Sequence, residues 1–297
     1  MTTLLTVIAA SFVFGMRTNT ILAQNMKTSA RAEALADAGV QRAFLEMFKS
    51  FIDKKRWKGD GTEHQWEFVG GKVNVSLLDV SGKIDINNAS DLLLKGLLKS
   101  AGMDDEKSAA MLDAIVDWRD PDDLKRLNGA EEAEYQDAGL KHKPANAPFE
   151  TVEELQRVLG MTPALYASLA DALTVDSHQA GINAVIASRQ VLLALPNADA
   201  AQVDAYIALR QEALANNAIV PVFLPAAALV AGDNGSVYSV RAEAILPDGG
   251  TFIRETVVRI NQGAVRKFAF MSWKEGIAAP HASPIPSSNE KPVIDEK

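Results

Sequence analysis

The chain of 297 residues contains no cysteine and only four histidines. The lack of cysteine excludes thiol nucleophiles, cysteine zinc sites and disulfide bonds. The histidines are scattered, and no two of them stand at helical spacing. The motifs of nucleotide-binding loops, serine hydrolases and zinc proteases are missing as well. We therefore expect no enzymatic activity and no small-molecule substrate. A hydrolase that uses paired carboxylates has no local signature and stays open as a third interpretation.

Positive charge is also scarce, with 30 Lys and Arg against 38 Asp and Glu, a net charge of −8. A nucleic-acid partner is not expected, because phosphate binding needs a basic surface. The hydrophobic fraction of 47% is ordinary for a globular protein. The length allows two domains, or one domain that carries a large insertion.

Long hydrophobic runs are few, and the uncharged run that opens the sequence, MTTLLTVIAASFVFGM, ends before Arg17. It is shorter than the roughly 20 residues of a membrane-spanning helix. It also lacks the basic start and the cleavage site of a secretory signal.

A helical pattern continues from this run to about residue 51, with Ala30, Ala34, Ala38 and Leu45 at helical spacing and no proline. One interpretation is an ordinary amphipathic helix with an apolar end. Helices beyond about 25 residues are unusual in globular domains. The sequence therefore favours one long helix whose first third lies in a bilayer.

Strand patterns occur near both ends of the rest of the chain. Val73, Val75 and Leu77 alternate with polar residues, and a Gly-Gly pair at 70–71 indicates a hairpin turn. Three further runs between residues 236 and 275 are separated by PDGG and NQG, which predicts an antiparallel meander. Because isolated hairpins are marginal, we expect the early and late strands to join into one sheet.

The predicted fold class is therefore α+β, with a large all-α insertion in a small sheet domain. The predicted parts are an N-terminal helix at 1–55, a sheet from 56–82 and 236–275, an inserted helical domain at 83–235, and a disordered, Pro- and Ser-rich tail at 276–297.

The helical block contains an internal repeat. Ile86-Asn87 and Ile182-Asn183 each precede a Leu-rich helix and then a second helix, which ends near Arg119 or Arg210. The segment at 148–175 predicts a third helical pair. This layout resembles helix-hairpin-helix or SAM-like packing, which often serves DNA binding. The phosphate-binding Gly-x-Gly hairpin is absent, and the net charge of the chain is negative, so structural or protein-binding use is favoured. A membrane-anchored DNA-binding protein is the alternative.

Acidic residues concentrate between 103 and 137, with twelve Asp or Glu against four Lys or Arg. A hydrated helical face would produce much of this. However, Asp117, Asp120, Asp122 and Asp123 crowd around Pro121, where a helix should end. Carboxylates held that close repel unless a cation neutralises them, and oxygen ligands in a loop suit Ca²⁺. A calcium loop and plain surface charge both stay open.

The cluster is not an EF-hand. If Asp120 is position 1, then Asp122, Asn128 and Glu131 fall at positions 3, 9 and 12. Positions 5 and 6 are leucine and lysine, where an acidic or amide ligand and glycine are expected. The sequence therefore leaves a looser calcium loop as the candidate.

The layout resembles one family, the K-class minor pseudopilins of type II secretion (general secretion pathway protein K). The matching phrases are DVSGKIDINNAS, AIVDWRDPDD, NGAEEAEYQ, KPANAPFETVEELQRVLGM, GINAVIASRQVLLAL and YSVRAEAILPDGGTFIRETVVRI. They run in the family's order up to about Trp273. The combination is specific, although each piece alone is weak.

The resemblance implies a pilin-like domain with an inserted helical domain and no catalysis. It implies a place at the tip of a periplasmic pseudopilus, with the I- and J-class minor pseudopilins as partners and a single-pass anchor in the bacterial inner membrane. It also implies calcium in the inserted domain, which carries over to Asp117, Asp120, Asp122 and Glu131.

Two features depart from the family. The basic stretch and glycine that the prepilin peptidase recognises are not present, and the apolar run is several residues short. A downstream start codon or a trimmed chain would account for both, so cleavage and anchoring cannot be read from these residues directly.

Overall fold

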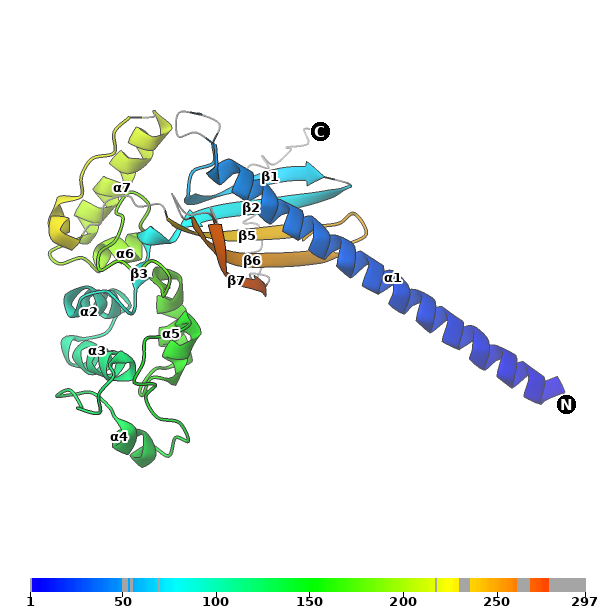
Figure 1. Cartoon of the computed structure of the whole chain (residues 1–297), viewed down its shortest axis with the longest axis horizontal. Coiled ribbons are helices and arrows are strands. Elements are labelled where there is room, and N and C mark those ends of the chain that lie inside the picture. Colours follow the sequence, from blue (N-terminus) through cyan, green and yellow to red (C-terminus); the bar gives the residue numbers. More distant parts are fainter. Residues whose placement is uncertain are drawn as a thin grey trace, which may run out of the picture.

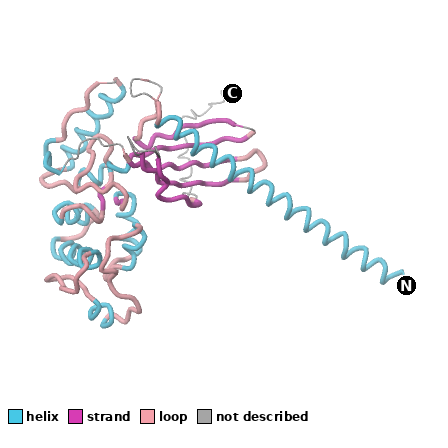
Figure 2. The backbone as a smooth tube through the Cα atoms, in the orientation of Figure 1, coloured by secondary structure: helices cyan, strands magenta, loops and turns pink. Residues whose placement is uncertain are grey.

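The structure is a computed structural model of the chain, and it describes residues 2–49, 53, 56–68, 70–216, 218–229, 236–260 and 268–277. A long helix crosses an antiparallel sheet, and a helical region lies at the end of the sheet opposite to the projecting half of the helix (Figures 1 and 2). The predicted tail from residue 278 onward and the predicted NQG turn at 261–263 lie outside the described residues.

The long helix is α1, Thr2–Met47, whose 46 residues extend for about 70 Å. Its C-terminal half packs on the sheet through one apolar stripe. The buried residues of this stripe are Ala32, Leu35, Ala36, Val40, Ala43, Phe44 and Met47. The spacing is that of an amphipathic helix. The prediction of one long helix is confirmed.

The prediction of which face of α1 is apolar and buried was wrong. Ala30 and Ala34 are exposed, and Leu45 is 63% exposed. A neighbouring stripe carries leucine, valine and phenylalanine, and it therefore removes more apolar area from water than a stripe of alanines. The helix also ends at Met47, short of the predicted boundary at 55, because the Lys49 N–H donates to the Glu46 carbonyl and tightens the last turn.

The sheet has five antiparallel strands in the order β1-β2-β5-β6-β7. Their bounds are β1 Asp60–Phe68, β2 Gly71–Asp79, β5 Val237–Ile245, β6 Thr251–Ile260 and β7 Phe268–Glu275. Strand β2 pairs with both β1 and β5, so residues far apart in the chain form one sheet, as predicted. Val73, Val75 and Leu77 of β2 are buried under α1, and the residues between them are less buried.

The region between β2 and β5 holds the remaining helices. Their bounds are α2 Asp91–Ser100, α3 Asp105–Arg119, α4 Glu132–Asp137, α5 Pro163–Leu169, α6 Arg189–Leu193 and α7 Ala200–Ala215. They surround a second hydrophobic core, separate from the one beneath α1. The side chains of Trp118 and Tyr135 are among the largest that this core buries completely.

This inserted region is less regular than the sequence predicts. A short parallel pair, β3 Ile84–Asp85 and β4 Leu173–Thr174, joins the start of this region to the segment between α5 and α6. The predicted third helical pair consists of a 3₁₀ helix, Val152–Arg157, followed by α5. The segments are too short for periodicity to distinguish an α-helix from a 3₁₀ helix.

The buried carboxylate of Asp85 holds this junction. One oxygen accepts hydrogen bonds from the Asn87 N–H, the Asn88 N–H and the Asn88 side chain at 2.9–3.1 Å. The other accepts from the Ser177 hydroxyl at 3.3 Å and the His178 N–H at 2.8 Å. The start of the inserted region and the segment that precedes α6 are thus joined at one side chain.

The internal repeat has a structural counterpart. Ser90 caps α2 and Ser188 caps α6, each through the N–H three residues on. The Arg119 guanidinium at the end of α3 donates to carbonyls just before Ser90, and the Arg210 guanidinium of α7 donates to the Ala184 and Ala187 carbonyls, both at 2.8 Å. The two helix pairs therefore share one manner of closure.

No helix in the described part of the chain is both long enough and apolar enough to cross a membrane.

Candidate functional site

The acidic cluster follows α3, and the local sequence determines where this helix begins and ends. The Asp104 carboxylate caps its first turn by accepting the Lys107 N–H at 2.8 Å. Asp120 is the C-cap and Pro121 follows, so the helix ends where the proline predicts. The chain then forms a loop at residues 120–131 that leads to α4, at the end of the inserted region away from the sheet (Figure 1).

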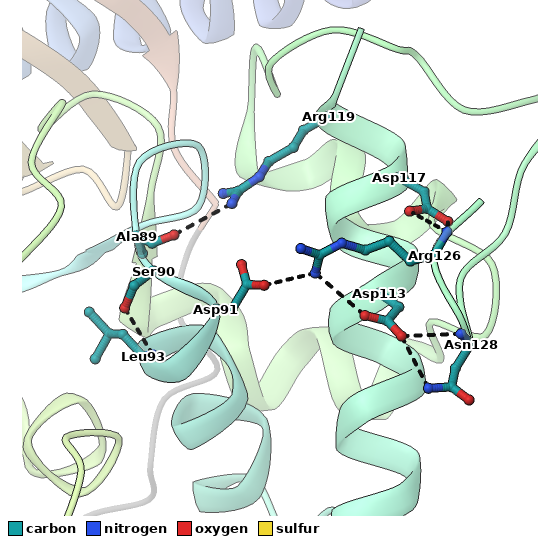
Figure 3. A network of polar contacts seen from close by, with 9 residues as sticks. All are labelled: Ala89, Ser90, Asp91, Leu93, Asp113, Asp117, Arg119, Arg126 and Asn128. Carbon is teal, nitrogen blue, oxygen red and sulfur yellow. Dashed lines mark hydrogen bonds and ion pairs between the residues drawn. The ribbon is translucent and has the colours of Figure 1, made fainter. Parts of the chain in front are cut away.

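The loop folds back on two aspartates of α3. The Asp117 carboxylate is fully buried and accepts the Arg126 N–H at 3.2 Å. The Asp113 carboxylate accepts both the backbone N–H and the side-chain N–H of Asn128 at 3.1 Å (Figure 3). Asn128, which falls at position 9 in the EF-hand comparison, thus holds the loop against α3 by donating its amide hydrogens to Asp113.

The Arg126 side chain connects this loop to α2. Its guanidinium lies 2.8 Å from the Asp91 carboxylate and 3.4 Å from that of Asp113 (Figure 3). Sequence reasoning missed both Asp113 and Arg126, because the pair forms between helices and has no fixed spacing along the chain.

Gly129 is a third residue that sequence reasoning missed. A Cβ atom at this position would stand 1.9 Å from a carboxylate oxygen of Asp117. No side chain fits there without moving the buried carboxylate. The glycine in the phrase NGAEE was a signal that could have indicated this close approach.

Glu131, at the start of α4, is buried with 7% of its surface exposed. Burial, and after it the fields of Asp117 and Asp120, raises the pKa of the Glu131 carboxyl to about 7. Burial also raises the pKa of Asp117 and of Asp120. The carboxylates at this site therefore lie in a setting that disfavours their negative charge.

Three buried oxygens of this region find no hydrogen-bond donor among the described residues: Asp120 Oδ1, Glu131 Oε1 and Asn146 Oδ1. Buried acceptors without donors are rare in folded proteins and require an explanation. Asp122 is exposed, and its carboxylate accepts the Leu124 N–H at 2.9 Å in a local turn.

Of the four predicted ligands, Asp117, Asp120 and Glu131 thus share a buried acidic environment, and Asp122 lies at its exposed edge. Within the ranges that the structure describes, no three His, Asp or Glu side chains are grouped as a metal site. The set of side chains nevertheless fits a hard cation. Its ligand atoms are all oxygens, and some of them are buried acceptors without a hydrogen-bond donor among the described residues. The residues would have to close further around an ion.

The comparisons with known proteins agree with one another. A family model described as Type II secretion system (T2SS), protein K, matches residues 71–177. The chain is 26% identical over 222 residues to Type II secretion system protein K of Klebsiella pneumoniae, covering 69% of this chain and 68% of that protein. The protein of the same name from Pectobacterium carotovorum subsp. carotovorum is 32% identical over 170 residues, covering 51% of each.

A solved chain in the GspK-GspI-GspJ complex from the type 2 secretion system of enterotoxigenic Escherichia coli has the same fold. The TM-score is 0.58 at 17% sequence identity, over 89% of this chain and 99% of that one. Both chains thus share a fold in which a long helix lies on an antiparallel sheet and a helical region is inserted in the chain between two of its strands. In sequence, the chain is similar to type II secretion system protein K, over residues 71–177 for the family model and over 69% of the chain for the Klebsiella protein.

Proposed function

We propose that this protein forms the tip of a type II secretion pseudopilus and assists protein export across the outer membrane, without catalysing a reaction. Its partners would be the I- and J-class minor pseudopilins. The observation that carries this proposal is the large region inserted in the sequence between strands β2 and β5, which are neighbours in the sheet. The solved chain of similar fold is part of a GspK-GspI-GspJ complex.

The position of the inserted region supports the tip. It lies at the end of the sheet opposite to the projecting half of α1 (Figure 2). In a fibre built by stacking sheet domains along their helices, it would cover the surface on which the next subunit stacks. Residue-specific crosslinking in assembled pseudopili should connect this chain to subunits on only one side of it along the fibre. Crosslinks to subunits on both sides along the fibre would refute the tip position.

The projecting half of α1 would anchor the protein in the inner membrane, with the bulk of the chain in the periplasm. Its exposed large apolar side chains include Phe12, Phe14, Ile21 and Leu22. Such side chains gain by burial in lipid or against other helices. Fractionation of cells should recover the chain with inner membranes, and recovery with the soluble periplasmic fraction would contradict the anchor.

Calcium would stabilise the inserted region through Asp117, Asp120, Asp122 and Glu131. A bound cation would supply positive charge to carboxylates whose pKa values burial raises, and would satisfy the buried oxygens of Asp120 and Glu131. The residues of the chain position these oxygens: Gly129 leaves room for Asp117, and Glu131 stands at the N-cap of α4.

Thermal denaturation tests the calcium proposal. Ca²⁺ should raise the melting temperature of the chelator-treated protein, because a ligand that binds the folded state stabilises it. The substitution Glu131→Gln should remove most of this rise. Glu132→Gln is the matched control, since Glu132 is exposed and pairs with Lys143. An unchanged melting temperature with and without Ca²⁺ would make the cluster a hydrated acidic surface.

The two helix pairs, α2–α3 and α6–α7, would be SAM-like or helix-hairpin-helix-like units used for packing. Their shared arginine contacts point to backbone carbonyls within the inserted region. A filter-binding assay at low salt should detect no salt-sensitive affinity for DNA, and such an affinity would favour a DNA-binding protein instead.

A further inference from the structure

The loop at residues 120–131 turns two polar side chains inward and two leucines outward. The Arg126 and Asn128 side chains turn toward α3 and bind Asp113, and the Arg126 backbone N–H donates to Asp117. Its two leucines turn to solvent: Leu124 is 76% exposed and Leu127 is 91% exposed. Exposed large apolar side chains mark a contact surface where they gather in one patch, and these two leucines stand only three positions apart.

The backbone around the two leucines is held in place. The Leu124 N–H donates to Asp122 at 2.9 Å, the Arg126 N–H donates to Asp117, and the Asn128 N–H donates to Asp113. These bonds fix the backbone at residues 124, 126 and 128, on both sides of Leu127 and at Leu124 itself. A partner that binds the leucines would therefore lose little conformational entropy from this side of the interface.

The charges around the leucines select the kind of partner. Asp122 and Asp123 immediately precede Leu124, and both are exposed. The nearby cations already have acidic neighbours, since Lys125 lies 2.6 Å from Glu134, and Arg126 pairs with Asp91 and Asp113. The outward charge is therefore negative. It repels a second copy of the same loop and an anionic lipid surface, and it complements a basic rim.

We propose that Leu124 and Leu127 dock into an apolar pocket of another protein, and that lysine or arginine side chains rim this pocket. The proposal does not depend on the tip position, because it concerns only the loop that protein hydrogen bonds already shape. It differs from the pilin-like contacts of α1, since the loop lies at the end of the inserted region away from the sheet (Figure 1).

Photo-crosslinking in native cells tests the proposal with the full chain. A benzophenone amino acid replaces Leu127, and the same probe at Leu209, 52% exposed on α7, is the matched control. We expect an adduct from position 127 alone. Its crosslinked peptide should map to an apolar surface with adjacent Lys or Arg. Leu124→Ser and, separately, Asp123→Lys should each lower the adduct yield about tenfold, as expected for a residue central to an interface.

The purified Leu124→Ser and Asp123→Lys variants should melt at the temperature of the unsubstituted protein, which separates lost binding from lost folding. Equal adducts from positions 127 and 209 would overturn the proposal. So would an adduct between two copies of this chain, or an adduct that neither substitution changes. Leucine-dependent binding of the purified protein to phosphatidylglycerol vesicles would overturn it as well, in favour of a lipid surface.

Discussion

Single carboxylates of this protein have roles that differ with their surroundings. Asp85 and Glu131 are both buried. The Asp85 carboxylate accepts five hydrogen bonds, so its charge is matched by donors. Glu131 has an oxygen with no donor among the described residues, and its pKa is raised. The first arrangement stabilises the fold, and the second favours binding of a cation.

Replacing Asp85 with alanine should destabilise the inserted region strongly. Five donors would lose their acceptor, and each buried unsatisfied group costs about 1–3 kcal/mol before relaxation. We expect a total loss of about 3–5 kcal/mol in the free energy of unfolding, measured by urea denaturation. Asp137→Ala, at an exposed position on α4, is the control and should change this energy by less than about 0.5 kcal/mol. A loss as small as the control's would show that these bonds contribute little.

Glu131 should make the calcium-free protein less stable as the pH rises. Its carboxyl has a pKa of about 7 in the folded chain and an ordinary value of 4.5. A pKa that folding raises stabilises the folded state fully below the ordinary value, and this contribution is lost as the pH rises through the folded value.

The melting temperature in chelator should therefore fall between about pH 5 and about pH 8, and Glu131→Gln should flatten this fall. Glu132→Gln should leave the slope unchanged, because that side chain is exposed. An equal slope in Glu131→Gln would mean that other groups cause the pH dependence.

At the scale of elements, two helix pairs are closed by the same device. Arg119 and Arg210 each reach back to the carbonyls that precede the capping serine of the first helix in the pair. The repeat was visible in the sequence as two similar phrases. The contacts were not, because 30 and 23 residues separate Arg119 from Ala89 and Arg210 from Ala187.

The substitutions Arg119→Met and Arg210→Met should each lower the free energy of unfolding by about 1.5–3 kcal/mol, the usual worth of hydrogen bonds to a charged group. Arg189→Met is the matched control. Arg189 forms an ion pair with Asp204 in which both side chains are about half exposed, so its loss should cost no more than about 1 kcal/mol. Chemical denaturation measures all three. If all three substitutions lowered the free energy of unfolding equally, the bonds of Arg119 and Arg210 to backbone carbonyls would contribute no more than a surface ion pair.

At the scale of the whole molecule, the projecting half of α1 and the inserted region lie at opposite ends of the sheet (Figure 1). The contact of α1 with the sheet is close, because a Cβ at Gly39 would stand 2.6 Å from a methyl group of Val73. The buried Arg254 of β6 adds ion pairs of 2.7 Å to Glu33 and Asp37 of α1. The direction in which the projecting half of α1 points therefore depends on this interface.

Gly39→Ala should lower the melting temperature although alanine favours a helix. The propensity gain is about 1 kcal/mol, whereas overpacking at a rigid interface costs about 1–3 kcal/mol. Gly15→Ala is the control, since nothing lies within 4 Å of its Cβ position, and it should be neutral or slightly stabilising. A higher melting temperature for Gly39→Ala would show that α1 shifts on the sheet without cost.

The amino-acid sequence by itself determined the long helix, the strands, their joining into one sheet and the end of α3 before Pro121, because periodicity, turn residues and proline act over short distances. It also placed Asp117, Asp120 and Glu131 in one acidic segment. Tertiary structure alone decided which stripe of α1 is buried, that Asp113 and Arg126 hold the loop, and that Leu124 and Leu127 face solvent. Those outcomes depend on the surfaces that other elements present, and no spacing along the chain records them.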